Sequence, residues 1–125
     1  MAMTRSKRKW VLLVVSATVL LGGAFSLPEQ QAKPVVQITA RMFDYTPARI
    51  ELKKGQPVVL ALTSLDRIHG FHIPGLGVRA DVLPGQTVEV EILPKQVGRL
   101  PFLCDLFCGD GHDEMSGVIV VTESP

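Results

Sequence analysis

Residues 104–115 read Cys104-Asp-Leu-Phe-Cys108-Gly-Asp-Gly-His112-Asp-Glu-Met115 and contain both cysteines of the chain. Thiolate, imidazole and thioether groups are the ligands that favour copper among the first-row metals. The spacing C-x3-C-x3-H-x2-M places four such groups in one short loop, and a further ligand must come from elsewhere in the chain. His69 is the candidate for it. This stretch predicts a metal site, provided that the rest of the chain builds a scaffold for the loop.

Segments with the pattern of short β-strands lie on both sides of this loop. Residues 87–92 alternate apolar and polar side chains, and residues 57–63 form a nearly continuous apolar run, which is typical of a strand covered on both faces. The expected strands are residues 35–42, 49–53, 57–63, 68–74, 78–83, 87–92, 100–104 and 117–122. Turn signals separate them, including Asp44–Pro47, and Met42 is expected in the core. The spacing predicts an all-β sandwich or barrel, with no helix after residue 27.

The N-terminus differs from the rest of the chain. Four basic residues precede Trp10–Leu27, an uncharged and mostly apolar run of 18 residues. A membrane-spanning helix needs about 17–25 apolar residues, whereas the apolar region of a signal peptide has about 7–15. The length favours a hydrophobic helix retained as a membrane anchor, with a signal peptide cleaved near Ala24–Ser26 as the alternative. We therefore divide the chain into an anchor or signal peptide (1–27), a linker (28–34) and a β-domain (35–125).

Charge and topology limit the partners of the exported part. Basic residues before an apolar run stay in the cytoplasm, so the β-domain is expected on the outer or periplasmic face, anchored or, after cleavage, free in the periplasm. Of the 13 basic residues in the chain, four lie before Trp10, which leaves nine against 12 acidic residues. This mildly acidic balance argues against a nucleic-acid partner, which requires a basic surface. It permits a basic protein partner.

The two thiols allow several readings. Two cysteines in an exported protein often form a disulfide, but His112 and Met115 at fixed spacing favour metal binding. The thiolates could bind one metal together with two histidines, as in a zinc site. Alternatively they could bridge two copper ions, each of which takes one imidazole, from His69 or His112. Met115 would then be a weak axial ligand of one copper, and the backbone carbonyl of Leu106 a weak ligand of the other.

The chain resembles the CuA domain, the dinuclear copper domain of cytochrome c oxidase subunit II. The resemblance covers nearly all of residues 35–122. It rests on Asp66-Arg-Ile-His69-Gly-Phe-His72, Val82-Leu-Pro84-Gly85, the C-x3-C-G-x2-H-x2-M loop and Gly117-Val-Ile-Val-Val. The His-Gly-Phe-His segment is most similar to the small subunit II of B-type oxidases, which has a single membrane anchor. The resemblance implies a Greek-key cupredoxin fold, two copper ions, and the ligands His69, Cys104, Leu106 through its carbonyl, Cys108, His112 and Met115.

The resemblance also implies electron transfer, with no bond-making chemistry on this chain. The implied partners are cytochrome c or a similar redox protein as donor, and oxidase subunit I; a stand-alone CuA carrier is the alternative. One electron shared by two coppers changes each metal–ligand bond little. A dry rim of Leu106, Phe107 and Phe71 is expected to limit the reorganisation of solvent, since the surroundings of a copper–thiolate centre tune its potential.

Two further features lie beside the proposed ligands in the sequence. His72 is expected at the surface or behind the ligands. Four acidic residues lie in or beside the loop and are expected to form either a solvated rim or a docking patch for a basic cytochrome c: Asp105, Asp110, Asp113 and Glu114.

Other functions use the same residues differently. A copper chaperone for oxidase assembly would hold the metal exchangeably. A mononuclear blue-copper protein would use Cys108, His112, Met115 and His69 and leave Cys104 without a role. A β-domain stabilised by structural zinc or by a disulfide would leave Met115 unexplained.

Overall fold

The computed structural model describes residue 23 and residues 25–125. Residues 25–34, which include the predicted linker, are exposed and have no regular secondary structure. The predicted hydrophobic helix, Trp10–Leu27, lies almost entirely outside the described residues. Within the described part, we find no helix whose length and apolar character would carry it across a membrane. The β-domain is the compact unit Gln31–Pro125.

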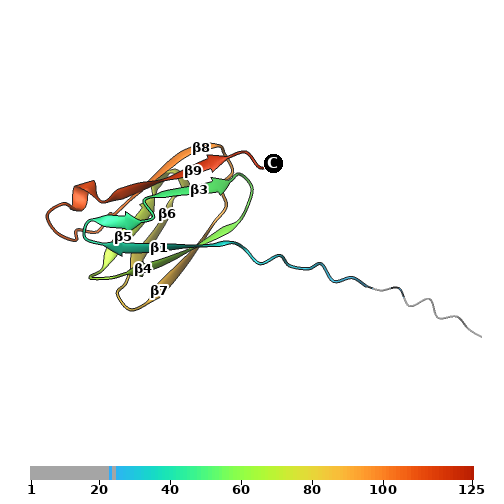
Figure 1. The fold of residues 1–125 in the computed structure, drawn as a ribbon, viewed down its shortest axis with the longest axis horizontal. Coiled ribbons are helices and arrows are strands. Elements are labelled where there is room, and N and C mark those ends of the chain that lie inside the picture. Colours follow the sequence, from blue (N-terminus) through green and yellow to red (C-terminus); the bar gives the residue numbers. More distant parts are fainter. Residues whose placement is uncertain (1–22, 24) are drawn as a thin grey trace, which may run out of the picture. The chain divides into compact units, whose positions relative to one another are not determined.

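Nine strands and two short 3-10 turns make up the regular structure of the described residues (Figure 1). The strands are β1 (Val35–Arg41), β2 (Asp44–Thr46), β3 (Arg49–Lys53), β4 (Val58–Ser64), β5 (His69–Ile73), β6 (Val78–Val82), β7 (Thr87–Ile92), β8 (Gly98–Leu103) and β9 (Ser116–Thr122). The turns are η1 (Pro74–Leu76) and η2 (His112–Glu114). The strands follow the sequence pattern. For example, β9 contains five consecutive β-branched residues, which pack well on a pleated surface.

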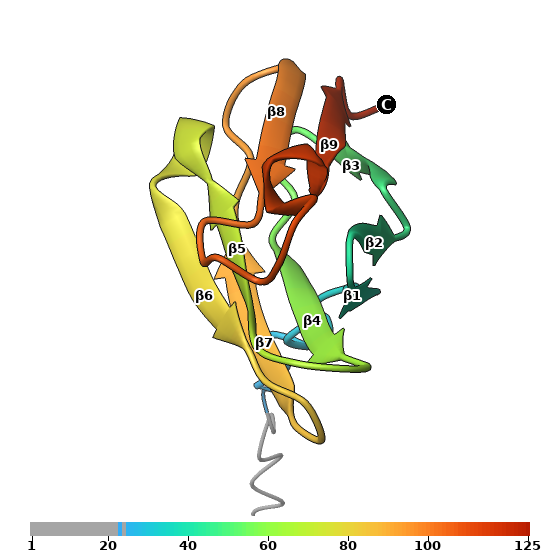
Figure 2. The same cartoon turned by 90° about the vertical axis from the view of Figure 1, so that its left-hand side faces the viewer.

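The strands form two sheets, which confirms the predicted β-sandwich (Figure 2). One sheet has the order β2-β1-β4-β7 and the other the order β3-β9-β8-β5-β6. The pairs β1–β4 and β3–β9 are parallel, and the other pairs are antiparallel. At the end of β8, Leu103 pairs with Ser116 at the start of β9 and with His72 of β5. The chain that leaves β8 therefore runs beside the first residues of β5, and β9 begins at the same end.

Three aromatic rings fill the core behind this end of the sandwich. Tyr45, Phe71 and Phe102 are at most 2% exposed. Their ring centroids lie 5.0–5.7 Å apart, and Tyr45 meets both phenylalanines edge to face. Tyr45 explains why the predicted turn at Asp44–Pro47 is wrong: residues 44–46 form strand β2, because pairing with β1 directs this ring into the core. The chain reverses earlier, at Met42 and Phe43.

Met42 is a second correction. It was expected in the core as the last residue of the first strand, but β1 ends at Arg41 and Met42 is 39% exposed. The reason is that the reversal between β1 and β2 carries it off the inner face of the sheet.

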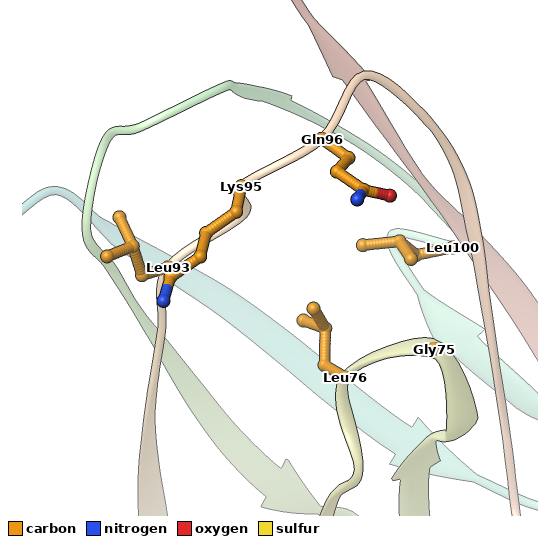
Figure 3. A pocket seen from close by; sticks show the side chains of 6 residues that line it. All are labelled: Gly75, Leu76, Leu93, Lys95, Gln96 and Leu100. Carbon is orange, nitrogen blue, oxygen red and sulfur yellow. The ribbon is translucent and has the colours of Figure 1, made fainter.

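The far end of the domain has a pocket of about 410 Å³ (Figure 3). It lies between η1, the segment after β7 and the first half of β8, and it is lined by Gly75, Leu76, Leu93, Lys95, Gln96 and Leu100. None of these side chains is a typical ligand of a soft metal.

Candidate metal centre

The structure brings the six predicted ligand residues into one cluster at the end of the sandwich. The side-chain ligand atoms of His69, Cys104 and Cys108 lie within 4.8 Å of one another, and all three residues are buried. The two sulfur atoms are 3.8 Å apart and are not joined in a disulfide. The Leu106 carbonyl oxygen lies 3.1 Å from Cys104 Sγ. Nδ1 of His112 and Sδ of Met115 lie 3.7 Å and 3.9 Å from Cys108 Sγ.

Strand ends hold several of these residues in place. His69 is the first residue of β5, and Cys104 directly follows β8. The backbone N–H of Cys104 donates to the carbonyl of Met115 over 3.1 Å, and Met115 N–H donates to the carbonyl of His112 over 3.1 Å. These bonds close residues 104–115 into a loop whose two ends are fixed by the sheet.

Gly70 allows the loop to lie directly on β5. A Cβ atom at this position would lie 2.0 Å from Oδ1 of Asp105 and 2.9 Å from its backbone nitrogen. The N–H of Gly70 donates to Cys104 Sγ over 3.3 Å. Only a residue without a side chain permits this approach of two backbones, and the resulting hydrogen bond favours a negative charge on the sulfur.

Phe43, which no sequence motif indicates, supports the loop from the other side. Gly109 and Gly111 both have positive φ angles, +137° and +113°, which favour glycine. Cβ atoms there would lie 3.2 Å and 2.7 Å from the Phe43 ring. The ring therefore packs against the glycine backbone, a contact between residues nearly 70 positions apart that no local motif indicates.

Asp66 orients the His69 ring. Its Oδ1 lies 2.6 Å from His69 Nε2 and accepts the N–H of Arg67 over 2.7 Å, while its Oδ2 accepts the N–H of Met42 over 2.7 Å. Burial alone would raise the pKa of this carboxyl. The hydrogen bonds from Met42, His69 and Arg67 outweigh that effect and hold the pKa of Asp66 well below its ordinary value of 3.8.

The lowered pKa of Asp66 gives a prediction for the copper-free protein. A group with a depressed pKa in the folded state contributes stability above its ordinary pKa and loses it as the pH falls. We expect the free energy of unfolding to decrease between about pH 5 and about pH 2, and to decrease less in Asp66→Asn. Urea unfolding at several pH values measures this. Asp113→Asn, which changes an exposed carboxylate, is the control and should keep the full pH dependence of the free energy of unfolding. Equal pH dependence in the unsubstituted chain and both variants would contradict the prediction.

One observation, independent of the types of donor atom, indicates that the cluster can hold a metal ion. Among the described residues, Nδ1 of His69 is the only buried side-chain nitrogen or oxygen atom without a hydrogen-bond partner. Because Nε2 of this ring contacts Asp66, a proton on Nε2 leaves a lone pair on Nδ1, and buried polar atoms without a partner are rare in folded proteins. Two thiols, two imidazoles and a thioether are the donors that copper prefers. The residues present therefore fit copper.

Burial keeps the Cys108 thiol protonated in the metal-free protein. It raises the pKa of Cys108 to about 11, helped by the neighbouring Cys104, while the positive charge of Arg67 acts in the opposite direction. Nη1 of Arg67 donates to the carbonyl of Cys108 over 3.1 Å. Burial also raises the pKa of Tyr45, whose hydroxyl donates to the Gly70 carbonyl over 2.5 Å. Because the pKa of Cys108 is raised, binding of a metal by this thiol should release a proton.

Two expectations about side chains around the centre are wrong in part. Phe71 is fully buried and Leu106 half-buried, but Phe107 is 75% exposed, so the expected dry rim of three residues is wrong for Phe107. Asp105 is not a free member of an acidic patch, because Nε of Arg79 contacts its Oδ2 over 2.5 Å.

The remaining acidic residues of the loop, and His72 of β5, agree with the expectations. Asp110, Asp113 and Glu114 are exposed. His72 is half-buried, and among the described residues it has no part in the cluster of ligand atoms around the thiols.

A β-sandwich with buried cysteine, histidine and methionine donors at one end defines the class of cupredoxins. Residues 10–121 match the family described as the cupredoxin-like domain, and the chain belongs to this family. Membership indicates copper as the metal of the site.

Among the relatives are subunits of respiratory oxidases. The chain is 41% identical over 88 residues to cytochrome c oxidase subunit 2 of Thermus thermophilus, a match that covers 70% of this chain and 65% of the relative. A second Thermus thermophilus subunit 2 has the same identity with 52% of its length covered. The alternative cytochrome c oxidase subunit 2 of Bradyrhizobium diazoefficiens is 32% identical over 72 residues, 58% of this chain and 26% of that protein. The chain thus spans less than two thirds of the length of these relatives.

Solved structures show the same fold. A chain of a heme-copper terminal oxidase dimer is 28% identical, with a TM-score of 0.65 and coverage of 78% of this chain and 74% of that chain. The periplasmic domain of cytochrome oxidase subunit II of Bradyrhizobium japonicum has a TM-score of 0.68, with coverage of 74% and 86%. At 20% identity, the second likeness concerns the fold alone.

Proposed function

We propose that this chain transfers electrons through a dinuclear copper centre of the CuA type. The ligands would be His69, Cys104, the Leu106 carbonyl, Cys108, His112 and Met115. One observation carries the proposal: two buried sulfurs lie 3.8 Å apart, and each has further donors beside it. Six donors exceed what one four-coordinate copper uses, whereas two metals that share both sulfurs use all of them.

The protein residues would hold the site rigid and dry. Cys104, Cys108 and Met115 are at most 3% exposed. Asp66 fixes the His69 ring, and the backbone of Gly70 fixes one sulfur. Bound copper would supply the one-electron chemistry. Because five of the six ligand residues come from one closed loop and His69 from strand β5, little has to move when the charge of the site changes, which keeps the barrier to electron transfer low.

The similarity to oxidase subunits supports a proposal for the partners. We infer that the donor is cytochrome c or a similar redox protein, and that the acceptor is an oxidase subunit I, unless the chain is a stand-alone carrier. The domain would work on the outer or periplasmic face of a membrane. Exposed apolar side chains at the metal end support docking of a protein there: Met42, Leu65, Ile68 and Phe107 are 39–75% exposed.

The test of the dinuclear centre is the copper content of the loaded full chain together with its electron paramagnetic resonance spectrum. We expect two coppers per chain and a signal from one electron shared equally by both. His69→Gln should remove this signal, because it removes the buried Nδ1. His72→Gln, a histidine change on the same strand, is the matched control and should retain it. A signal from a single copper would support the mononuclear alternative, and rapid loss of copper to a chelator would support a chaperone.

The acidic residues Asp110, Asp113 and Glu114 give a prediction for the donor. If they attract a basic cytochrome c, the rate of electron transfer should fall as ionic strength rises from about 0.01 M to about 0.15 M, because the screening length shortens from about 30 Å to about 8 Å. Stopped-flow mixing with a basic cytochrome c measures the rate. Asp113→Asn should weaken the salt dependence, and Glu89→Gln on β7 should leave it unchanged. A rate indifferent to salt would count against an electrostatic docking patch.

A further inference from the structure

Arg67 joins the segment before β5 to the metal loop. It lies between Asp66 and His69, and its Nη1 donates to the backbone carbonyl of Cys108, 41 positions further along the chain, over 3.1 Å. This is a direct contact between an arginine side chain and the backbone of a residue proposed to bind copper.

The charge of Arg67 is not cancelled by an ion pair in the described part of the chain. Arg79, by contrast, contacts Asp81 over 2.8 Å and Asp105 of the loop over 2.5 Å. No ion pair of this kind includes Arg67 among the described residues. Asp66, its neighbour, accepts the backbone N–H of Arg67 and holds the His69 ring instead of the guanidinium group.

We propose that Arg67 is a positioning residue of the copper centre that fastens the loop at Cys108 and raises the reduction potential of the site. The proposal rests on the proposed function only in requiring a copper centre with Cys108 as a ligand. It therefore applies to a dinuclear or a mononuclear centre, and its failure can be told apart from failure of the dinuclear proposal.

The direction of the effect follows from charge. Reduction moves one electron from the donor protein onto the centre, and no covalent bond is made or broken. A fixed positive charge beside the ligand stabilises the added negative charge. The reduced form therefore becomes more stable relative to the oxidised form, and the reduction potential rises. Because Arg67 is exposed, solvent and salt screen this interaction. We expect removal of the Arg67 charge to increase the ratio of oxidised to reduced protein about threefold at a fixed applied potential. For one electron, this corresponds to a lowering of the midpoint potential by about 28 mV.

Two substitutions separate charge from fastening. Arg67→Gln removes the charge but keeps an amide donor, and Arg67→Lys keeps the charge but loses the planar fork of donors. Arg99→Gln removes the same charge at the other end of β8 and is the matched control. The midpoint potential of each copper-loaded full chain is measured by redox titration at low salt, followed by the visible spectrum. Amide hydrogen exchange of residues 105–112 in the copper-free chain measures the fastening without any metal.

We expect Arg67→Gln to lower the potential, Arg67→Lys to restore most of it, and Arg99→Gln to leave it unchanged. Hydrogen exchange in the loop should become faster in Arg67→Gln than in Arg99→Gln. Equal potentials in Arg67→Gln and Arg99→Gln would overturn the electrostatic role, and so would an equal lowering in Arg67→Lys and Arg67→Gln. Unchanged exchange in the loop would overturn the fastening role.

Discussion

Cys104→Ser is expected to abolish the shared copper signal and to leave the chain with at most one copper ion. The physical reason is that a serine hydroxyl stays protonated and is a poor ligand for copper, whereas a bridging thiolate serves two metals at once. Cys104 is 2% exposed and lies 3.8 Å from the sulfur of Cys108, and the chain has only these two cysteines, so no other thiol can take its place. Copper analysis and electron paramagnetic resonance of the loaded full chain measure both effects.

The comparison with Cys108→Ser makes this prediction decisive. If both sulfurs bridge, the two substitutions remove the shared signal equally. In a mononuclear centre built on Cys108, Cys104→Ser would leave copper binding and the spectrum unchanged, while Cys108→Ser would remove both. If Cys104→Ser left the copper content and the spectrum unchanged, this result would refute the dinuclear centre. The assignment to the cupredoxin fold would not be affected.

Phe102→Ala is expected to cost about 3–5 kcal/mol of unfolding free energy, the range for a large aromatic side chain removed from a core. Phe102 is fully buried, and its ring contacts those of Tyr45 and Phe71. The total free energy of unfolding of a typical domain is only about 5–15 kcal/mol. The loss should show as a much lower urea midpoint for the copper-free chain.

Phe107→Ala is the matched control for this change. It removes the same side chain only five positions away, but Phe107 is 75% exposed. Its effect on stability should stay within about 0.5 kcal/mol, as for most surface substitutions. Comparable losses in the two variants would mean that the aromatic cluster is not the core of this end of the sandwich.

Much of the fold could be predicted from local pattern. The alternation in residues 49–53 and 87–92 reports which side of a strand is buried, because successive side chains point to opposite faces. The predicted strands there match β3 and β7. The local pattern predicts a turn at residues 44–47, whereas the structure has strand β2 there, because the burial of Tyr45 depends on distant phenylalanines.

The sequence by itself determined the class of the protein and the donors available to a metal, because a strand pattern is periodic and C-x3-C-x3-H-x2-M lies in one continuous loop. Tertiary structure alone decided that His69 reaches this loop with a free Nδ1, that Asp66 holds its ring, and that Arg67 meets Cys108. These contacts join the segment between β4 and β5 to the loop that follows β8, at one end of the sandwich. Arg67 and Cys108 lie 41 positions apart, a separation that no local pattern encodes, so only the tertiary packing could reveal their contact.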